Sequence, residues 1–85
     1  MNRAVCEAAE ECPNMVLIAS ATGDAQALAA IRRLGASRIC FGSDWPFRKI
    51  HVVRAMFEAG VGEEVSAAEM DLSMGGNLKR LLRVP

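Results

Sequence analysis

The sequence lacks paired cysteines and contains a single histidine, His51. Its three cysteines, Cys6, Cys12 and Cys40, have no CxxC spacing, which argues against a zinc ribbon and against a disulfide-stapled scaffold. One histidine cannot build a histidine-rich metal site, and a lone histidine in a helical segment is more often structural or exposed than a ligand. We therefore expect reduced thiols in a cytoplasmic protein.

An excess of charge and a long apolar run are also absent. Ten basic and ten acidic residues cancel, so the concentrated basic face of a nucleic-acid-binding protein is missing and no nucleic-acid partner is expected. No apolar stretch approaches the ~20 residues of a membrane span. Glu7, Glu10 and Glu11 lie where a signal peptide needs its apolar core. The sequence predicts a soluble protein without a membrane partner.

Three motifs that would indicate a chemistry are missing as well. No GxGxxG follows either of the apolar runs described below, and the chain has no GxxxxGK[ST]. Ser43 lies in Gly42–Ser43–Asp44–Trp45 rather than in GxSxG. Nucleotide binding and serine hydrolysis therefore have no support from motifs.

The 85 residues, 52% of them hydrophobic, suit one small packed α/β domain. Helical periodicity predicts helices, and continuous apolar runs predict strands covered on both faces. The predicted order is α–β–α–β–α–α, over Arg3–Glu11, Met15–Ser20, Ala25–Leu34, Arg38–Asp44, Ile50–Ala59 and a short helix from Ser66 towards Met74, with a last helical turn after Gly75–Gly76.

The ends of these helices carry recognisable signals. Asp24 and Asn77 are predicted N-caps, and Ser66 with Glu69 forms a predicted capping box. Gly35 and Gly60 are predicted to end the helices that precede them.

Two parallel strands leave both edges of a sheet unpaired, and such edges invite further strands. Parallel strands also occur mostly in larger sheets that are covered on both faces. We therefore expect residues 1–85 to be a single partial domain, which is either a fragment of a larger α/β protein or is completed by association with another chain.

Asp44 is the leading candidate for chemistry, because it ends a buried strand just before Trp45–Pro46. In α/β folds the carboxyl ends of the strands carry the active site. A carboxylate there can ligate a divalent metal or act as a general base. The alternative is that Asp44 only caps a turn or the following helix, which is a common role of aspartate.

The residues that follow Asp44 have two interpretations each. Trp45 and Phe47 form either a pocket wall or ordinary packing beside the strand end. Arg48 and Lys49 open a helix, where cations are mildly unfavourable; they either bind an anionic substrate or form a solvated surface pair.

Four segments together resemble the amidohydrolase-related family of metal-dependent hydrolases, which includes some decarboxylases. Phe41–Phe47 (FGSDWPF) resembles the signature of the family's last strand, and Pro13–Ile18 resembles the approach to its seventh strand. Ile31–Ile39 resembles the helix before strand eight, and Gly75–Leu82 resembles the closing helix.

The resemblance implies the C-terminal portion of a (β/α)8 TIM-type barrel, in which Asp44 matches the strand-eight aspartate. In the family this residue ligates or neighbours a divalent metal ion, with zinc the first choice, and shuttles a proton from metal-bound water. The implied function is hydrolysis or decarboxylation of a small-molecule substrate. The family's His-x-His and its further histidines have no counterpart in this sequence, so only Asp44 is carried over as a catalytic and metal-binding residue.

Two alternatives to the hydrolase remain open. In the first, the chain is a non-catalytic truncated or split product that acts, if at all, by self-association or by pairing with the missing barrel portion. In the second, it is half of an open doubly wound sheet that binds a small ligand at its strand ends, although the chain has no Gly-rich phosphate loop.

Overall fold

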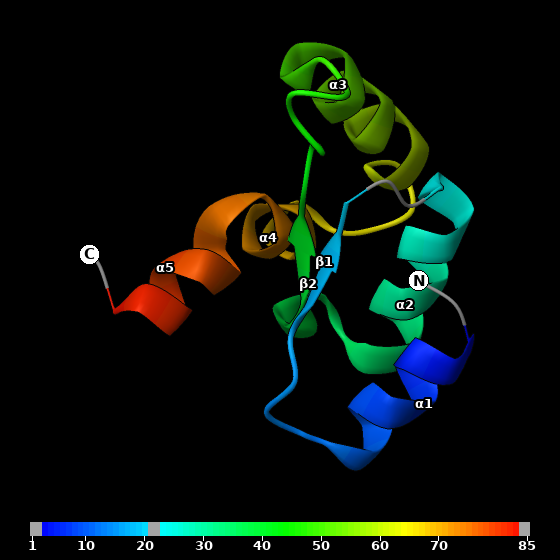
Figure 1. The fold of residues 1–85 in the computed structure, drawn as a ribbon, viewed down its shortest axis with the longest axis vertical. Coiled ribbons are helices and arrows are strands. Elements are labelled where there is room, and N and C mark those ends of the chain that lie inside the picture. Colours follow the sequence, from blue (N-terminus) through cyan, green and yellow to red (C-terminus); the bar gives the residue numbers. More distant parts are fainter. Residues whose placement is uncertain (1–2, 21–22, 84–85) are drawn as a thin grey trace.

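The computed structural model describes residues 3–20 and 23–83 as a small α/β fold made mostly of helices. Five helices, two strands and two short helical segments follow one another in these ranges. They are α1 (Arg3–Glu11), β1 (Leu17–Ala19), α2 (Asp24–Leu34), the 3-10 segment η1 (Ala36–Arg38), β2 (Ile39–Phe41), α3 (Ile50–Val61), α4 (Ala67–Asp71), the π-helical segment η2 (Leu72–Gly76) and α5 (Asn77–Leu82). The predicted order α–β–α–β–α–α is confirmed (Figure 1).

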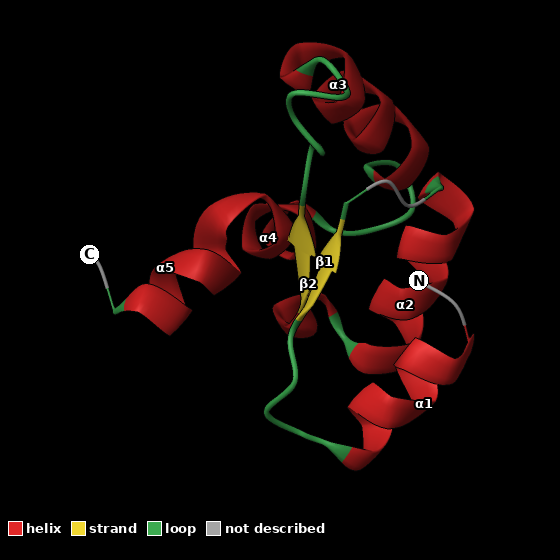
Figure 2. Ribbon diagram, viewed as in Figure 1, coloured by secondary structure: helices red, strands yellow, loops and turns green. Residues whose placement is uncertain are grey.

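The two strands pair in parallel, with Ile18 opposite Cys40 in the register. Helix α2 makes the crossover between them, as a parallel connection requires (Figure 2). Each strand is shorter than the apolar run from which it was predicted, because only three residues of each run pair with the other strand. Beyond β2 the backbone of Asp44 is left-handed, with φ of 64°, and an extended strand cannot continue through that conformation.

The sheet has one covered face and one more open face. Leu17, Ala19 and Ile39 point into the apolar cluster formed with the helices. Ile18 lies on the other face, where 64% of its surface is exposed. Gly42 belongs to that face too, since a Cβ at Gly42 would lie 2.7 Å from Cγ2 of Ile18. In β1 the alternation expected for a strand is therefore present, although the apolar sequence hides it, whereas in β2 both Ile39 and Cys40 are buried.

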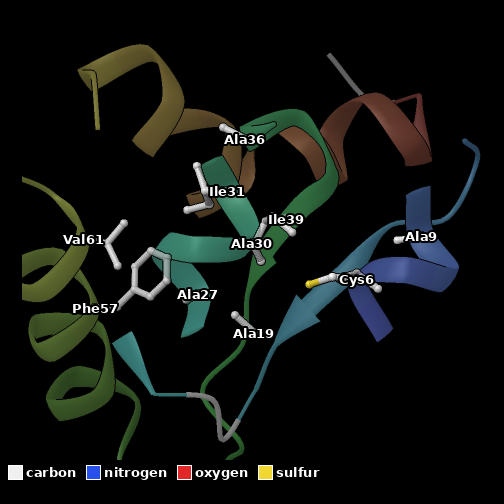
Figure 3. Packing of buried hydrophobic residues seen from close by; sticks show 11 residues of the cluster. Cys6, Ala9, Ala19, Ala27, Ala30, Ile31, Ala36, Ile39, Phe57 and Val61 are labelled. Atoms are coloured by element: carbon white, nitrogen blue, oxygen red, sulfur yellow. The ribbon is translucent and has the colours of Figure 1, made fainter. Parts of the chain in front are cut away.

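Small side chains make up most of the buried cluster (Figure 3). Ala27 and Ala30 of α2 allow this helix to lie close to the sheet, and Phe57 and Val61 of α3 pack against it. The ring of Phe57 meets that of Phe41 edge-on, with 5.2 Å between the centroids, an arrangement that aromatic pairs prefer.

The guanidinium of Arg38 joins the amino end of β2 to two earlier segments. It donates hydrogen bonds to the carbonyl oxygens of Ala9, Cys12 and Met15. Ala9 lies in the last turn of α1, where helical carbonyls have no partner within the helix. Cys12 lies just beyond the helix, and its carbonyl also accepts from the backbone N–H of Met15. Arg38 thereby gives hydrogen-bond partners to carbonyl oxygens at the end of α1 and fixes the position of the segment that leads into β1.

Asn77 was predicted as a helix cap, and this prediction is wrong. The residue is the first of α5, and its side chain makes no capping hydrogen bond. It is fully buried, and its amide nitrogen donates to the carbonyls of Ala36 (2.7 Å) and Ile39 (2.9 Å). Its oxygen accepts from Arg80. Asn77 therefore ties α5 to the start of β2.

The other helix-end predictions have mixed outcomes. The capping box of Ser66 and Glu69 is confirmed with both of its hydrogen bonds, and Gly35 ends α2 with φ of 94°. The N-cap of α2 is Gly23 rather than Asp24, which is the first helical residue. Helix α3 runs through Gly60 to Val61, since Val61 packs into the core.

Many large apolar side chains are exposed on the described surface. They are Val5, Met15, Ile18, Trp45, Phe47, Ile50, Val52, Met56, Leu78, Leu81 and Leu82. Helices in the described part of the chain are too short or too polar to cross a lipid bilayer.

We expect Arg38→Lys to lower the free energy of unfolding by roughly 2 kcal/mol, because an ammonium group cannot reach three carbonyls at once. Urea denaturation measures the change. Arg32→Lys is the matched control, since Arg32 forms an exposed ion pair with Glu64, and such pairs contribute under about 1 kcal/mol. Equal effects of the two substitutions would contradict the role of Arg38.

Ser73 in the π-helical segment is 3% exposed, and its hydroxyl has no hydrogen-bond partner among the described residues. An unpaired buried hydroxyl is costly. We expect Ser73→Ala to leave stability unchanged or to raise it by up to about 1 kcal/mol, measured by the same denaturation. A loss of stability would show that the hydroxyl has a partner in solution.

Candidate functional site

The carboxyl ends of β1 and β2 point the same way, towards helix α3 (Figure 1). The chain after β2 passes through Gly42 and Ser43 to Asp44, which is partly exposed. The start of α2 also lies at this end of the sheet, because β1 leads into it. Asp44 is therefore where a parallel fold places its functional groups.

A tight turn holds the backbone of Asp44. Its carbonyl oxygen accepts hydrogen bonds from the backbone N–H groups of Phe47 (3.0 Å) and Arg48 (3.3 Å). The peptide bond between Trp45 and Pro46 is cis. The backbone N–H of Trp45 donates to the hydroxyl of Ser43.

The alternative role of Asp44 as a side-chain cap has no support from these contacts. The turn is closed by the main-chain carbonyl, and the N-cap residue of α3 is Lys49. Among residues 3–20 and 23–83, nothing donates a hydrogen bond to the Asp44 carboxylate or pairs with it. The carboxylate is thus available to a group outside the described chain.

The left-handed backbone conformation of Asp44 is a second feature of a functional residue. Aspartate tolerates this conformation better than most residues, yet the conformation costs an L-residue roughly 1–2 kcal/mol. Conformations of this kind cluster at active sites and ligand clamps.

A small cavity of about 140 Å³ opens at the same end of the sheet. Its polar lining comes from Asp24 at the start of α2 and from Arg48 in the turn after Asp44. Its apolar walls include Phe41 and Phe57. The sequence predicts Asp24 as a cap and gives Arg48 two interpretations, an anion-binding residue or one of a surface pair. The two residues lie far apart in the sequence, so only the fold brings them to one cavity.

The remaining predicted positions lie elsewhere. Trp45 is 68% and Phe47 is 86% exposed, so of their two interpretations the one of ordinary packing beside the strand end is wrong. Trp45 and His51 line a second hollow with Lys49 and Ile50, which shares no lining residue with the cavity of Asp24 and Arg48. Phe47 lines neither of these hollows.

No group of three or more His, Cys, Asp or Glu side chains in the described ranges could hold a metal ion together. Tight sites use three or four protein ligands. Cys40 is no substitute, because burial raises the pKa of its thiol, an effect that the charge of Arg80 offsets only in part; a neutral thiol is a poor ligand and nucleophile. These residues alone do not fit a complete metal site.

Comparison of the chain with models of protein families, with curated proteins and with solved structures finds no match in any of the three.

The backbone of Asp44 gives a prediction on stability. We expect Asp44→Gly to keep or slightly raise the free energy of unfolding, and Asp44→Val to lower it by about 1–2 kcal/mol, because a β-branched residue fits poorly at positive φ. Urea denaturation of both variants, with Asp44→Asn as the isosteric control, measures the difference. Equal stability of the Val and Gly variants would mean that Asp44 is not left-handed in solution.

Proposed function

We propose that this chain is the C-terminal portion of a (β/α)8 barrel of the amidohydrolase-related type, and that Asp44 is a carboxylate of its active site. The observation that carries the proposal is the position of Asp44. Its carboxylate has no described partner, and its backbone is held by two hydrogen bonds in a turn at the carboxyl end of a parallel strand.

The two faces of the sheet support the barrel. In a barrel, helices cover the outer face, and inward side chains from alternate strands fill the inside. Helices cover the face that carries Leu17 and Ile39. On the other face Ile18 is largely exposed, although Cys40 beside it is buried. The small Gly42 shares this second face. Further parallel strands would cover Ile18 and extend the sheet.

Asp44 would serve as a general base towards water and as one ligand of a divalent cation, for which zinc is the first candidate. Further ligands would have to come from outside the described residues, since these hold no ligand cluster. The substrate would be a small molecule that undergoes hydrolysis or decarboxylation.

Association with another chain is the second candidate function. The exposed side chains of Leu78, Leu81 and Leu82 favour it, since they lie together on one side of α5 and exposed apolar patches mark interaction sites. Size-exclusion chromatography of the purified chain tests it. A stable monomer that holds a metal ion would contradict this candidate.

In the protein that contains the completed sheet, we expect Asp44→Asn to lower turnover by at least about 100-fold, the scale of a lost general base, while the thermal unfolding midpoint stays unchanged. Asp71→Asn is the matched control, because Asp71 is an exposed acidic residue at the end of α4. Near-normal turnover of the Asp44→Asn variant would refute the assignment.

A further inference from the structure

We propose that the cavity at the carboxyl ends of the strands binds a small carboxylate that also carries a hydroxyl or ammonium group, through Arg48 and Asp24. Asp44 does not line this cavity. The proposal therefore stands independently of the proposed hydrolase.

Arg48 supplies the anion-binding group. Its side chain is half-buried at the cavity and makes no ion pair with a described residue, whereas Arg32, Arg33 and Arg54 each pair with a glutamate. The backbone N–H of Arg48 donates to the carbonyl of Asp44, which fixes the start of the side chain. A guanidinium binds a carboxylate through two parallel hydrogen bonds.

Asp24 supplies an acceptor in the same cavity. A Cβ on residue 60 would lie only 2.2 Å from one of its carboxylate oxygens, so the absence of a side chain at Gly60 leaves room for the carboxylate. An ionised carboxylate only accepts hydrogen bonds. The ligand must therefore offer a donor to Asp24, and a doubly charged anion without one would be repelled.

The walls and the size restrict the rest of the ligand. Phe41, Val53 and Phe57 are apolar and would contact a short carbon skeleton. The volume of about 140 Å³ is well below the roughly 300–1,000 Å³ of pockets for larger ligands. Lactate has the required carboxylate and hydroxyl, and propionate is its counterpart without the hydroxyl.

The test is titration of the full chain with lactate and with propionate, followed by the backbone amide NMR signals of Gly23, Gly42 and Phe57. We expect saturable shifts with lactate in the millimolar range and weaker binding of propionate. Arg48→Gln should weaken lactate binding at least tenfold. Lys49→Gln is the matched control, since Lys49 is the neighbouring cation and does not line the cavity; it should leave binding unchanged.

Two further variants complete the design. Asp24→Asn should remove the preference for lactate over propionate. Met56→Phe narrows the cavity from an exposed position and should weaken binding even if Arg48→Gln fails to fold. Absence of saturable shifts in the unmodified chain would overturn the proposal, as would equal losses in the Arg48 and Lys49 variants or an unchanged preference in Asp24→Asn.

Discussion

The hydrogen bonds of one side chain, Arg38, hold the architecture together at the amino end of the sheet. Its guanidinium reaches carbonyls of Ala9, Cys12 and Met15, which lie 23 to 29 residues earlier in the chain. The carbonyl of Ala9 lies at a helix end, where an unpaired polar group is costly, whereas the carbonyl of Cys12 also accepts from the backbone N–H of Met15. Because Arg38 directly precedes β2, the same contacts set β2 beside the approach to β1, and the parallel register follows.

The two ends of the sheet consequently differ in character. At the amino end, Arg38, Asn77 and Arg80 donate their hydrogen bonds to backbone carbonyls. At the carboxyl end, Asp44 and Arg48 have no ion pair among the described residues. This division is typical of α/β folds, in which one end of the sheet stabilises the structure and the other carries chemistry.

The core explains why the exposed apolar surface matters. Alanines supply much of the buried cluster, so the helices lie close to the sheet, yet each contact buries little apolar area. Larger apolar residues such as Ile18 and Leu82 remain on the surface. A domain of this size buries a modest fraction of its surface, and covering these side chains would add to its stability. Further strands of a barrel and a second chain would both have this effect.

Features that depend on neighbouring residues could be predicted from the sequence. Helix α1, the capping box at Ser66 and the order of strands and helices follow from periodicity and capping, which act within a few residues. The position of Asp44 just beyond a strand followed from the apolar run and the proline after it. The role of Asn77, which ties α5 to β2 rather than capping a helix, became visible only in the fold. The fold also brings Asp24 and Arg48 to one cavity and places Ile18 on the open face. These features depend on contacts between residues far apart in the chain, and local sequence patterns do not predict which distant residues will be in contact.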